Sequence, residues 1–163
     1  GQRLLEVFKK AGWNVELSDN AMGAVWQKFI YLTGSAEVNA ITQITFQEMR
    51  TIPETRALII NAWKEIISVA KAADAPIGED ILEWCESALD SFPATGMTSL
   101  ANDFRNGNRV ELEGITGVVA RMGREVGVPT PIHDTIYALL KPAALKIEES
   151  YAHPSTSSGS RDR

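Results

Sequence analysis

The chain has little of what most metal and disulfide sites require. Its 163 residues include one cysteine, Cys85, and two histidines, His133 and His153. A lone cysteine excludes an internal disulfide and a cysteine cage, and two histidines at this separation do not suggest a metal site. We therefore expect a cytoplasmic protein in a reducing environment, with no bound metal.

Long apolar runs and an excess of positive charge are also missing. No stretch approaches the roughly 20 apolar residues of a membrane span, so we expect no membrane association. The net charge is −5, which argues against a nucleic-acid partner. The sequence contains neither a Gly-x-Gly-x-x-Gly fingerprint nor a P-loop, so we expect no tight nucleotide binding by this chain alone. With 44% hydrophobic and 23% charged residues, the composition is that of an ordinary globular domain.

The first 18 residues differ in pattern from the rest. Residues 2–11 have helical spacing and end at Gly12, whereas Trp13 to Ser18 alternate apolar and polar side chains, as in a strand. A single strand has no neighbour to pair with. We therefore predict that residues 1–18 are the trailing edge of a sheet domain that lies outside this chain.

The remainder predicts an all-α bundle over residues 19–152. Ser18 or Asp19 is the expected cap of the first helix, and Thr51 with Glu54 forms an expected capping box. Further helices are expected near 78–90, 113–126 and from Thr130 onward, with Pro142 kinking the last one or lying near a break in it. Residues 153–163 are rich in serine and are predicted to be a disordered tail.

Two isolated candidates are better explained by structure than by chemistry. Cys85 lies on an amphipathic helix, where burial as a small apolar residue is favoured over use as a nucleophile. His133 lies in the first turn of the last helix, where a capping or surface role is favoured.

Lys28 lies in the apolar helical stretch Trp26-Gln27-Lys28-Phe29-Ile30-Tyr31-Leu32. One interpretation is a lysine whose aliphatic stem is buried while its ammonium reaches water. The other is a partly desolvated ammonium that donates a proton in catalysis. The residues alone favour the first interpretation.

The stretch from Met97 to Gly114 offers a second candidate site. It contains a hydroxyl at a helix start, Ser99, then a glycine turn at Gly107, and a carboxylate before the next helix, Glu111. A helix start presents unpaired amides that can hold a carboxylate. The alternative is ordinary helix capping by Ser99 with solvated charges around it.

Together and in this order, these stretches resemble the C-terminal domain of the ketopantoate reductase family, over roughly residues 15–142. The resemblance rests on Trp26-x-Lys28, on Pro53-Glu54-Thr55-Arg56 and on Ser99-x3-Asp103-x3-Gly107-x-Arg109-x-Glu111. It continues through Gly114, Gly117 and the run from Gly123 to Pro131. It implies a helical bundle similar to the C-terminal domain of 6-phosphogluconate dehydrogenase, joined in the family to an N-terminal Rossmann domain.

The resemblance also implies an activity and roles for three residues. Family members reduce 2-dehydropantoate (ketopantoate) to pantoate with NADPH, in a cleft between their two domains. Lys28 matches the general acid that protonates the ketone, Ser99 matches the hydroxyl that holds the substrate, and Glu111 matches the carboxylate that reaches the cofactor. A homodimer is expected, and the helical domain alone is expected to be inactive.

The chain departs from the family pattern at three positions. Leu32, Ala36 and Phe46 occupy places where the family archetype has asparagines. Loss of these polar groups predicts another 2-oxo acid as substrate, or weak binding of ketopantoate. Asn39 is a candidate replacement if the helix is shifted locally. The same loss supports a rival hypothesis, a non-catalytic dimerisation or interaction module on the family scaffold.

Overall fold

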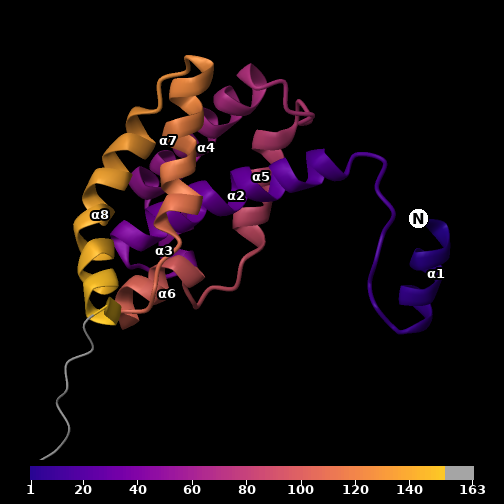
Figure 1. Ribbon diagram of the computed structural model, residues 1–163, viewed down its shortest axis with the longest axis horizontal. Coiled ribbons are helices and arrows are strands. Elements are labelled where there is room, and N and C mark those ends of the chain that lie inside the picture. The colour runs from indigo at the N-terminus through magenta and orange to yellow at the C-terminus, as the bar shows by residue number, and fades with distance from the viewer. Residues whose placement is uncertain (153–163) are drawn as a thin grey trace, which may run out of the picture.

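A computed structural model describes residues 1–152 and confirms the all-α prediction. Its helices are α1 (Gln2–Lys10), α2 (Ala21–Thr42), α3 (Phe46–Thr51), α4 (Pro53–Ala72), α5 (Ile81–Ser91), α6 (Ser99–Asn106), α7 (Leu112–Val126) and α8 (Pro131–Ala152). Helices α2 to α8 form the bundle in Figure 1. No helix among residues 1–152 is long and apolar enough to cross a membrane. The tail predicted at 153–163 lies outside the described residues.

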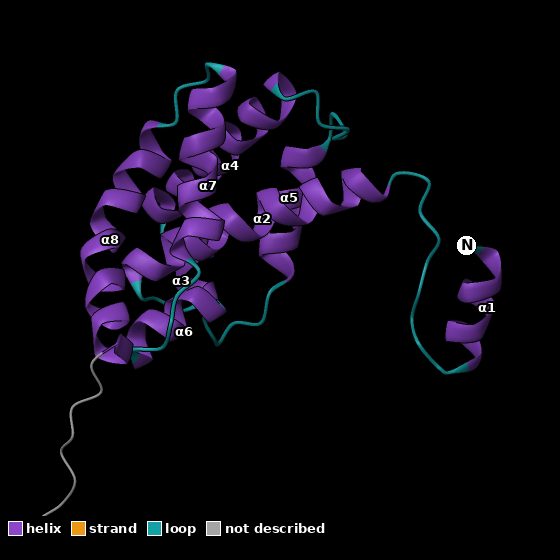
Figure 2. Cartoon of the chain, in the orientation of Figure 1, coloured by secondary structure: helices purple, strands orange, loops and turns teal. Residues whose placement is uncertain are grey.

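The predicted strand from Trp13 to Ser18 is wrong. This segment has no regular secondary structure, and Figure 2 draws it as a loop between α1 and α2. Backbone groups of a strand need a partner strand, and residues 1–152 contain none. Helix α1 lies apart from the bundle (Figure 1), and its Leu4 and Val7 are 61% and 55% exposed.

Helix α2 forms the centre of the bundle because nearly every residue of its second half is buried. It packs against α4, α6, α7 and α8. Trp63 of α4 is fully buried against it, and its indole Nε1 donates a hydrogen bond to the carbonyl of Tyr31 at 3.2 Å. Gly34 allows this close approach, since a Cβ there would lie 2.5 Å from Cδ1 of Trp63.

The helix starts differ from those expected. Asn20, rather than Ser18 or Asp19, caps α2 by accepting a 2.9 Å hydrogen bond from the amide of Gly23. The capping box belongs to the short helix α3, which the sequence analysis missed, and is formed by Thr45 and Glu48. The backbone amide and then the hydroxyl of Thr45 lower the pKa of Glu48.

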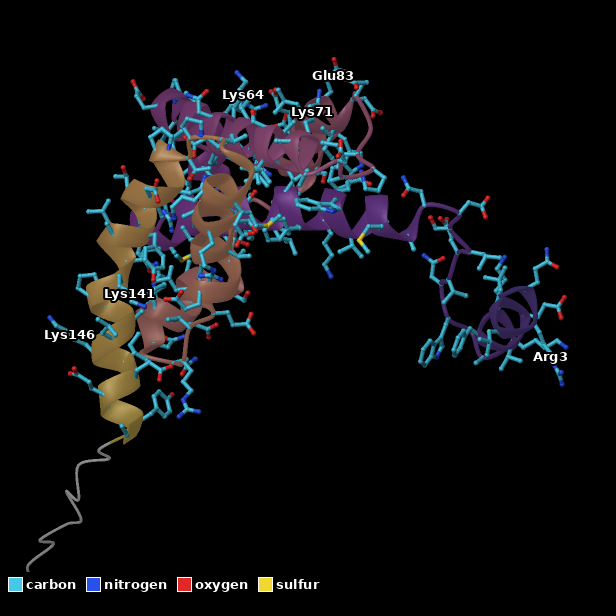
Figure 3. The ribbon with its side chains drawn as sticks, turned by 45° about the horizontal axis from the view of Figure 1, so that its top comes forward. Arg3, Lys64, Lys71, Glu83, Lys141 and Lys146 are labelled. Carbon is cyan, nitrogen blue, oxygen red and sulfur yellow. The ribbon has the colours of Figure 1, made fainter. Side chains whose placement is uncertain are left out.

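Helix α8 runs without interruption through Pro142, so the expected break is absent. It is joined to α7 at the surface by Glu113, which accepts hydrogen bonds from Arg121, Tyr137 and Lys141. Charged side chains on the outside of the bundle include Lys64 and Lys71 of α4 and Lys141 and Lys146 of α8 (Figure 3).

The surface role expected for His133 is also wrong, because this residue is fully buried. Its Nδ1 lies 2.7 Å from Oε2 of Glu65, and its Nε2 lies 3.1 Å from Oε1 of Glu37. Backbone amides of Ile132 and His133 also donate to Glu65, at 2.9 and 3.2 Å. We call Glu37, His133 and Glu65 the Glu-His-Glu cluster. It joins α2, α4 and α8 in the interior.

The two carboxyl groups of the cluster differ in environment. Burial raises the pKa of Glu37 well above its usual value, and the charge of Glu65 adds to the rise. Burial also acts to raise the pKa of Glu65, but its hydrogen bonds from His133 and Ile132 outweigh burial and lower the pKa. Glu65 is therefore the carboxyl of the cluster that ionises at the lower pH.

Candidate active site

A cavity of about 710 Å³ lies where the middle of α2 meets the starts of α6 and α7. This is within the size range of small-molecule sites. The residues around it come from α2, the start of α3, the segment between α5 and α6, the first residue of α6, and the start of α7 with the residue before it. They are Val25, Lys28, Phe29, Leu32, Thr33, Ser35, Ala36, Phe46, Phe92, Met97, Thr98, Ser99, Glu111, Gly114 and Ile115.

The structure brings all three predicted site residues to this cavity. Lys28 comes from α2, Ser99 is the first residue of α6, and Glu111 directly precedes α7. All three side chains are exposed, so the cavity opens to solvent on the side where they lie. Lys28 is exposed in the structure, so its ammonium can be reached from the cavity.

Asn39 fixes the start of α6 beside α2. It is fully buried, and its Oδ1 accepts hydrogen bonds from the amide and the hydroxyl of Thr98, at 2.8 and 3.1 Å. Its Nδ2 donates to the carbonyl of Ile44 at 2.7 Å. The amide group is thus committed to the backbone, so Asn39 does not replace a substrate-binding asparagine. It holds Ser99 at the cavity through the neighbouring Thr98.

The start of α6 suits an anionic group. Thr98 caps this helix by accepting a 3.3 Å hydrogen bond from the amide of Ala101. The first amides of a helix lack intrahelical acceptors, and the helix dipole favours negative charge there. Ser99 and its amide therefore offer donors for a carboxylate at the cavity, while Lys28 supplies a positive charge.

One wall of the cavity is aromatic and apolar. The rings of Phe46 and Phe92 stack with centroids 4.4 Å apart and planes 14° apart. Leu32, Ala36 and Met97 extend this surface. We call Leu32, Ala36, Phe46, Phe92 and Met97 the apolar wall. Three of its members are the residues at which the sequence departs from the family pattern.

Comparison with known proteins shows which family the chain resembles. Residues 20–144 match the family described as "Ketopantoate reductase PanE/ApbA C terminal". The match covers most of the chain and includes all three predicted site residues. The chain belongs to the ketopantoate reductase family.

Individual relatives agree with this membership. The 2-dehydropantoate 2-reductase of Mesorhizobium japonicum is 28% identical over 148 residues, which are 88% of this chain and 43% of that protein. The corresponding protein of Pyrobaculum aerophilum is 26% identical over 141 residues, 85% of this chain and 49% of that protein. The chain therefore spans about half the length of the curated relatives it matches.

Solved structures share the fold. A PanE/ApbA family ketopantoate reductase from Ralstonia eutropha superposes with a TM-score of 0.82 at 28% identity, covering 91% of this chain and 49% of that one. A D-mandelate dehydrogenase, solved with NADH and anilino(oxo)acetate, superposes with a TM-score of 0.78 at 20% identity. It covers 90% of this chain and 61% of that one, and at this identity the likeness concerns the fold alone.

In this ketopantoate reductase domain, sequence reasoning missed two features of the site: the positioning role of Asn39, and the place of Phe92 and Met97 in the apolar wall. The Asn39 side chain had no visible partner in the sequence, because Thr98 is far along the chain. Phe92 and Met97 lie in the irregular segment between α5 and α6, where periodicity carries no information. The apolar residues Leu32, Ala36 and Phe46, which stand where the family archetype has asparagines, were the one feature of the sequence that pointed to the apolar wall.

Proposed function

We propose that this chain is the substrate-side domain of an NADPH-dependent reductase that converts a 2-oxo acid, ketopantoate or a related compound, to the 2-hydroxy acid. The observation that supports it is the meeting of Lys28, Ser99 and Glu111 on one cavity. Family membership supplies the reaction class, since the relatives named above are 2-dehydropantoate 2-reductases.

Each residue has a role that its chemistry suits. The ammonium of Lys28 donates a hydrogen bond to the ketone oxygen, stabilises the negative charge that develops there, and then transfers a proton to it. Ser99 and the start of α6 bind the carboxylate of the substrate. Placing both groups on one cavity orients the carbonyl before reaction.

Glu111 is the residue that we assign to the cofactor. NADPH supplies the hydride to the carbonyl carbon when it is bound. The chain has no glycine-rich phosphate loop, so most of the cofactor's contacts must come from a nucleotide-binding domain. Glu111 fits a contact to the polar end of the nicotinamide or its ribose, because it is exposed at the cavity and makes no side-chain cap to α7.

The partners follow from the same proposal. We assign residues 1–18 to the edge of the nucleotide-binding domain, which agrees with the exposed apolar residues of α1. We propose a cytoplasmic homodimer as the working form. The isolated helical domain is expected to be inactive and to show no micromolar affinity for NADPH in calorimetry.

A non-catalytic interaction module is the second candidate. It is favoured by the apolar wall, where Leu32, Ala36 and Phe46 offer no polar group to a hydroxylated substrate. The two candidates differ in turnover, since a module without chemistry oxidises neither NADPH nor NADH in the presence of any 2-oxo acid.

The deciding experiment uses the protein with its nucleotide-binding domain attached. Cofactor oxidation is followed with a panel of 2-oxo acids, for the wild type and for Lys28→Ala. Loss of the acid should lower kcat by about 10²- to 10⁴-fold. Lys146→Ala is the matched control, because Lys146 is exposed on α8 away from the cavity. Unchanged turnover in the Lys28 variant would refute the role of Lys28, and no turnover by a protein that binds cofactor would favour the module.

A further inference from the structure

We propose that the substrate is a 2-oxo acid with an aryl or branched apolar side chain that carries no hydroxyl group, and that the apolar wall selects it. The inference rests on the reductase function proposed above and narrows its substrate class. Leu32 is the residue on which selection depends most directly.

The position of Leu32 carries the first part of the argument. Leu32 lies one helical turn after Lys28, so both side chains project from the same face of α2 into the cavity. A ketone held at Lys28 therefore presents its side chain to Leu32. Leu32 is 43% exposed in this chain, so its apolar surface is available to a ligand.

The stacked rings carry the second part. Phe46 and Phe92 line the cavity together, and Met97 lies beside them. Aromatic rings add an edge-to-face or offset contact of their own to simple area burial. The methionine thioether adapts to irregular shapes and makes favourable contacts with rings. This combination fits a phenyl or branched alkyl group better than a hydroxymethyl group.

The hydroxyl groups next to the apolar wall are either shielded from solvent or already hydrogen-bonded within the protein. The Ser35 hydroxyl is buried without a hydrogen-bond partner and is shielded from solvent at its place beside the cavity. The Thr98 hydroxyl is engaged with Asn39 and Ala101, and Thr33 is only 2% exposed. A substrate hydroxyl placed against the wall would lose its water without gaining a partner, which costs binding free energy.

A matched pair of substrates tests the inference on the protein with both domains. 3,3-Dimethyl-2-oxobutanoate differs from ketopantoate only by lacking the hydroxyl, and 2-oxo-2-phenylacetate adds a ring. We expect kcat/KM for the two apolar acids to exceed that for ketopantoate by at least about tenfold, because rejection of one hydroxyl by an apolar site reaches about 100-fold.

The variant Leu32→Asn tests the residue. The asparagine side chain has nearly the same size as that of leucine. The variant should lower the preference for 3,3-dimethyl-2-oxobutanoate over ketopantoate by about tenfold, mainly through KM. Leu139→Asn is the matched control, since Leu139 is 63% exposed on α8 and does not line the cavity. An unchanged preference in the Leu32 variant would overturn the selection by Leu32.

The remaining outcomes separate the two levels of the proposal. A wild-type preference for ketopantoate overturns the apolar substrate class while the reductase function stands. If Ser35→Ala then removes that preference, the hydroxyl of Ser35 is the missing partner. Absence of turnover with every acid overturns the reductase function, and the substrate class falls with it.

Discussion

Replacing His133 with leucine should strongly destabilise this domain, because the fully buried imidazole contacts two carboxyl groups in the interior. In His133→Leu, the carboxylate of Glu65 loses a 2.7 Å contact, and Glu37, which is fully buried, loses its 3.1 Å contact. Leaving a buried polar group without its partner costs about 1–3 kcal/mol. We expect that loss in the free energy of unfolding at pH 7, measured by urea titration with circular dichroism.

Glu37→Gln is the informative companion variant. It keeps the contact between His133 and Glu65, and it replaces the carboxyl of Glu37, whose charged form is disfavoured by burial. The neutral amide of glutamine has nearly the shape of a protonated carboxyl group, so the exchange avoids the cost of burying a charge. We expect this variant to equal or exceed the wild type in stability at pH 7.

The pH dependence has a definite sign. Because burial and then Glu65 raise the pKa of Glu37 in the folded state, protonation of this carboxyl favours folding. The stability gained from this protonation is complete below the pKa of the unfolded state, 4.5, and is lost as the pH rises through the pKa of the folded state. The stability of Glu37→Gln relative to the wild type should therefore increase with pH above about 4.5.

Two results would refute this reasoning. One is a His133→Leu variant within about 0.5 kcal/mol of the wild type, the range of an ordinary surface substitution. The other is a Glu37→Gln variant that loses as much stability as His133→Leu, which would mean that Glu37 is a full partner of the imidazole.

Two further predictions concern the packing of the bundle. Gly34→Ala should lower the free energy of unfolding by about 1–3 kcal/mol and change the tryptophan fluorescence, because the new Cβ would lie 2.5 Å from Trp63. In Gly114→Ala the new Cβ meets nothing within 4 Å, so this variant should gain about 0.5–1 kcal/mol of stability. Equal effects of the two substitutions would contradict this reasoning. Cys85 is fully buried, and this burial, together with the charge of Glu86, raises the pKa of its thiol to about 12. A thiol reagent such as dithionitrobenzoate should therefore react with Cys85 only after unfolding. Rapid labelling of the native protein would show that the thiol is accessible.

Local signals in the sequence predicted the later helices well. Gly127 ends α7 in a left-handed conformation, and Pro131 opens α8, as their residue types indicate. The strand was predicted wrongly because alternation alone does not supply a neighbouring strand. Helix α3 was missed because six residues are too few to show a period, although its Thr45 and Glu48 were visible as a capping box.

Long-range pairing was beyond the reach of local patterns. Nothing in the first turn of the last helix shows that His133 meets Glu65, 68 residues earlier in the chain. The meeting of Lys28, Ser99 and Glu111 was predicted from the family resemblance, because the same fold places those positions on one cavity. The aromatic pair of Phe46 and Phe92 required the structure, since it joins α3 to the residue that follows α5.

The Glu-His-Glu cluster and the cavity lie on different faces of the same helix. Glu37 follows Ala36 directly, so the cluster anchors α2 in the interior while the neighbouring residue faces the cavity. A change in packing behind α2 would move Leu32 and Ala36, the two members of the apolar wall that this helix carries. Substitutions at interior positions that do not line the cavity can therefore change its shape, and a comparison of relatives confined to the cavity residues would overlook them.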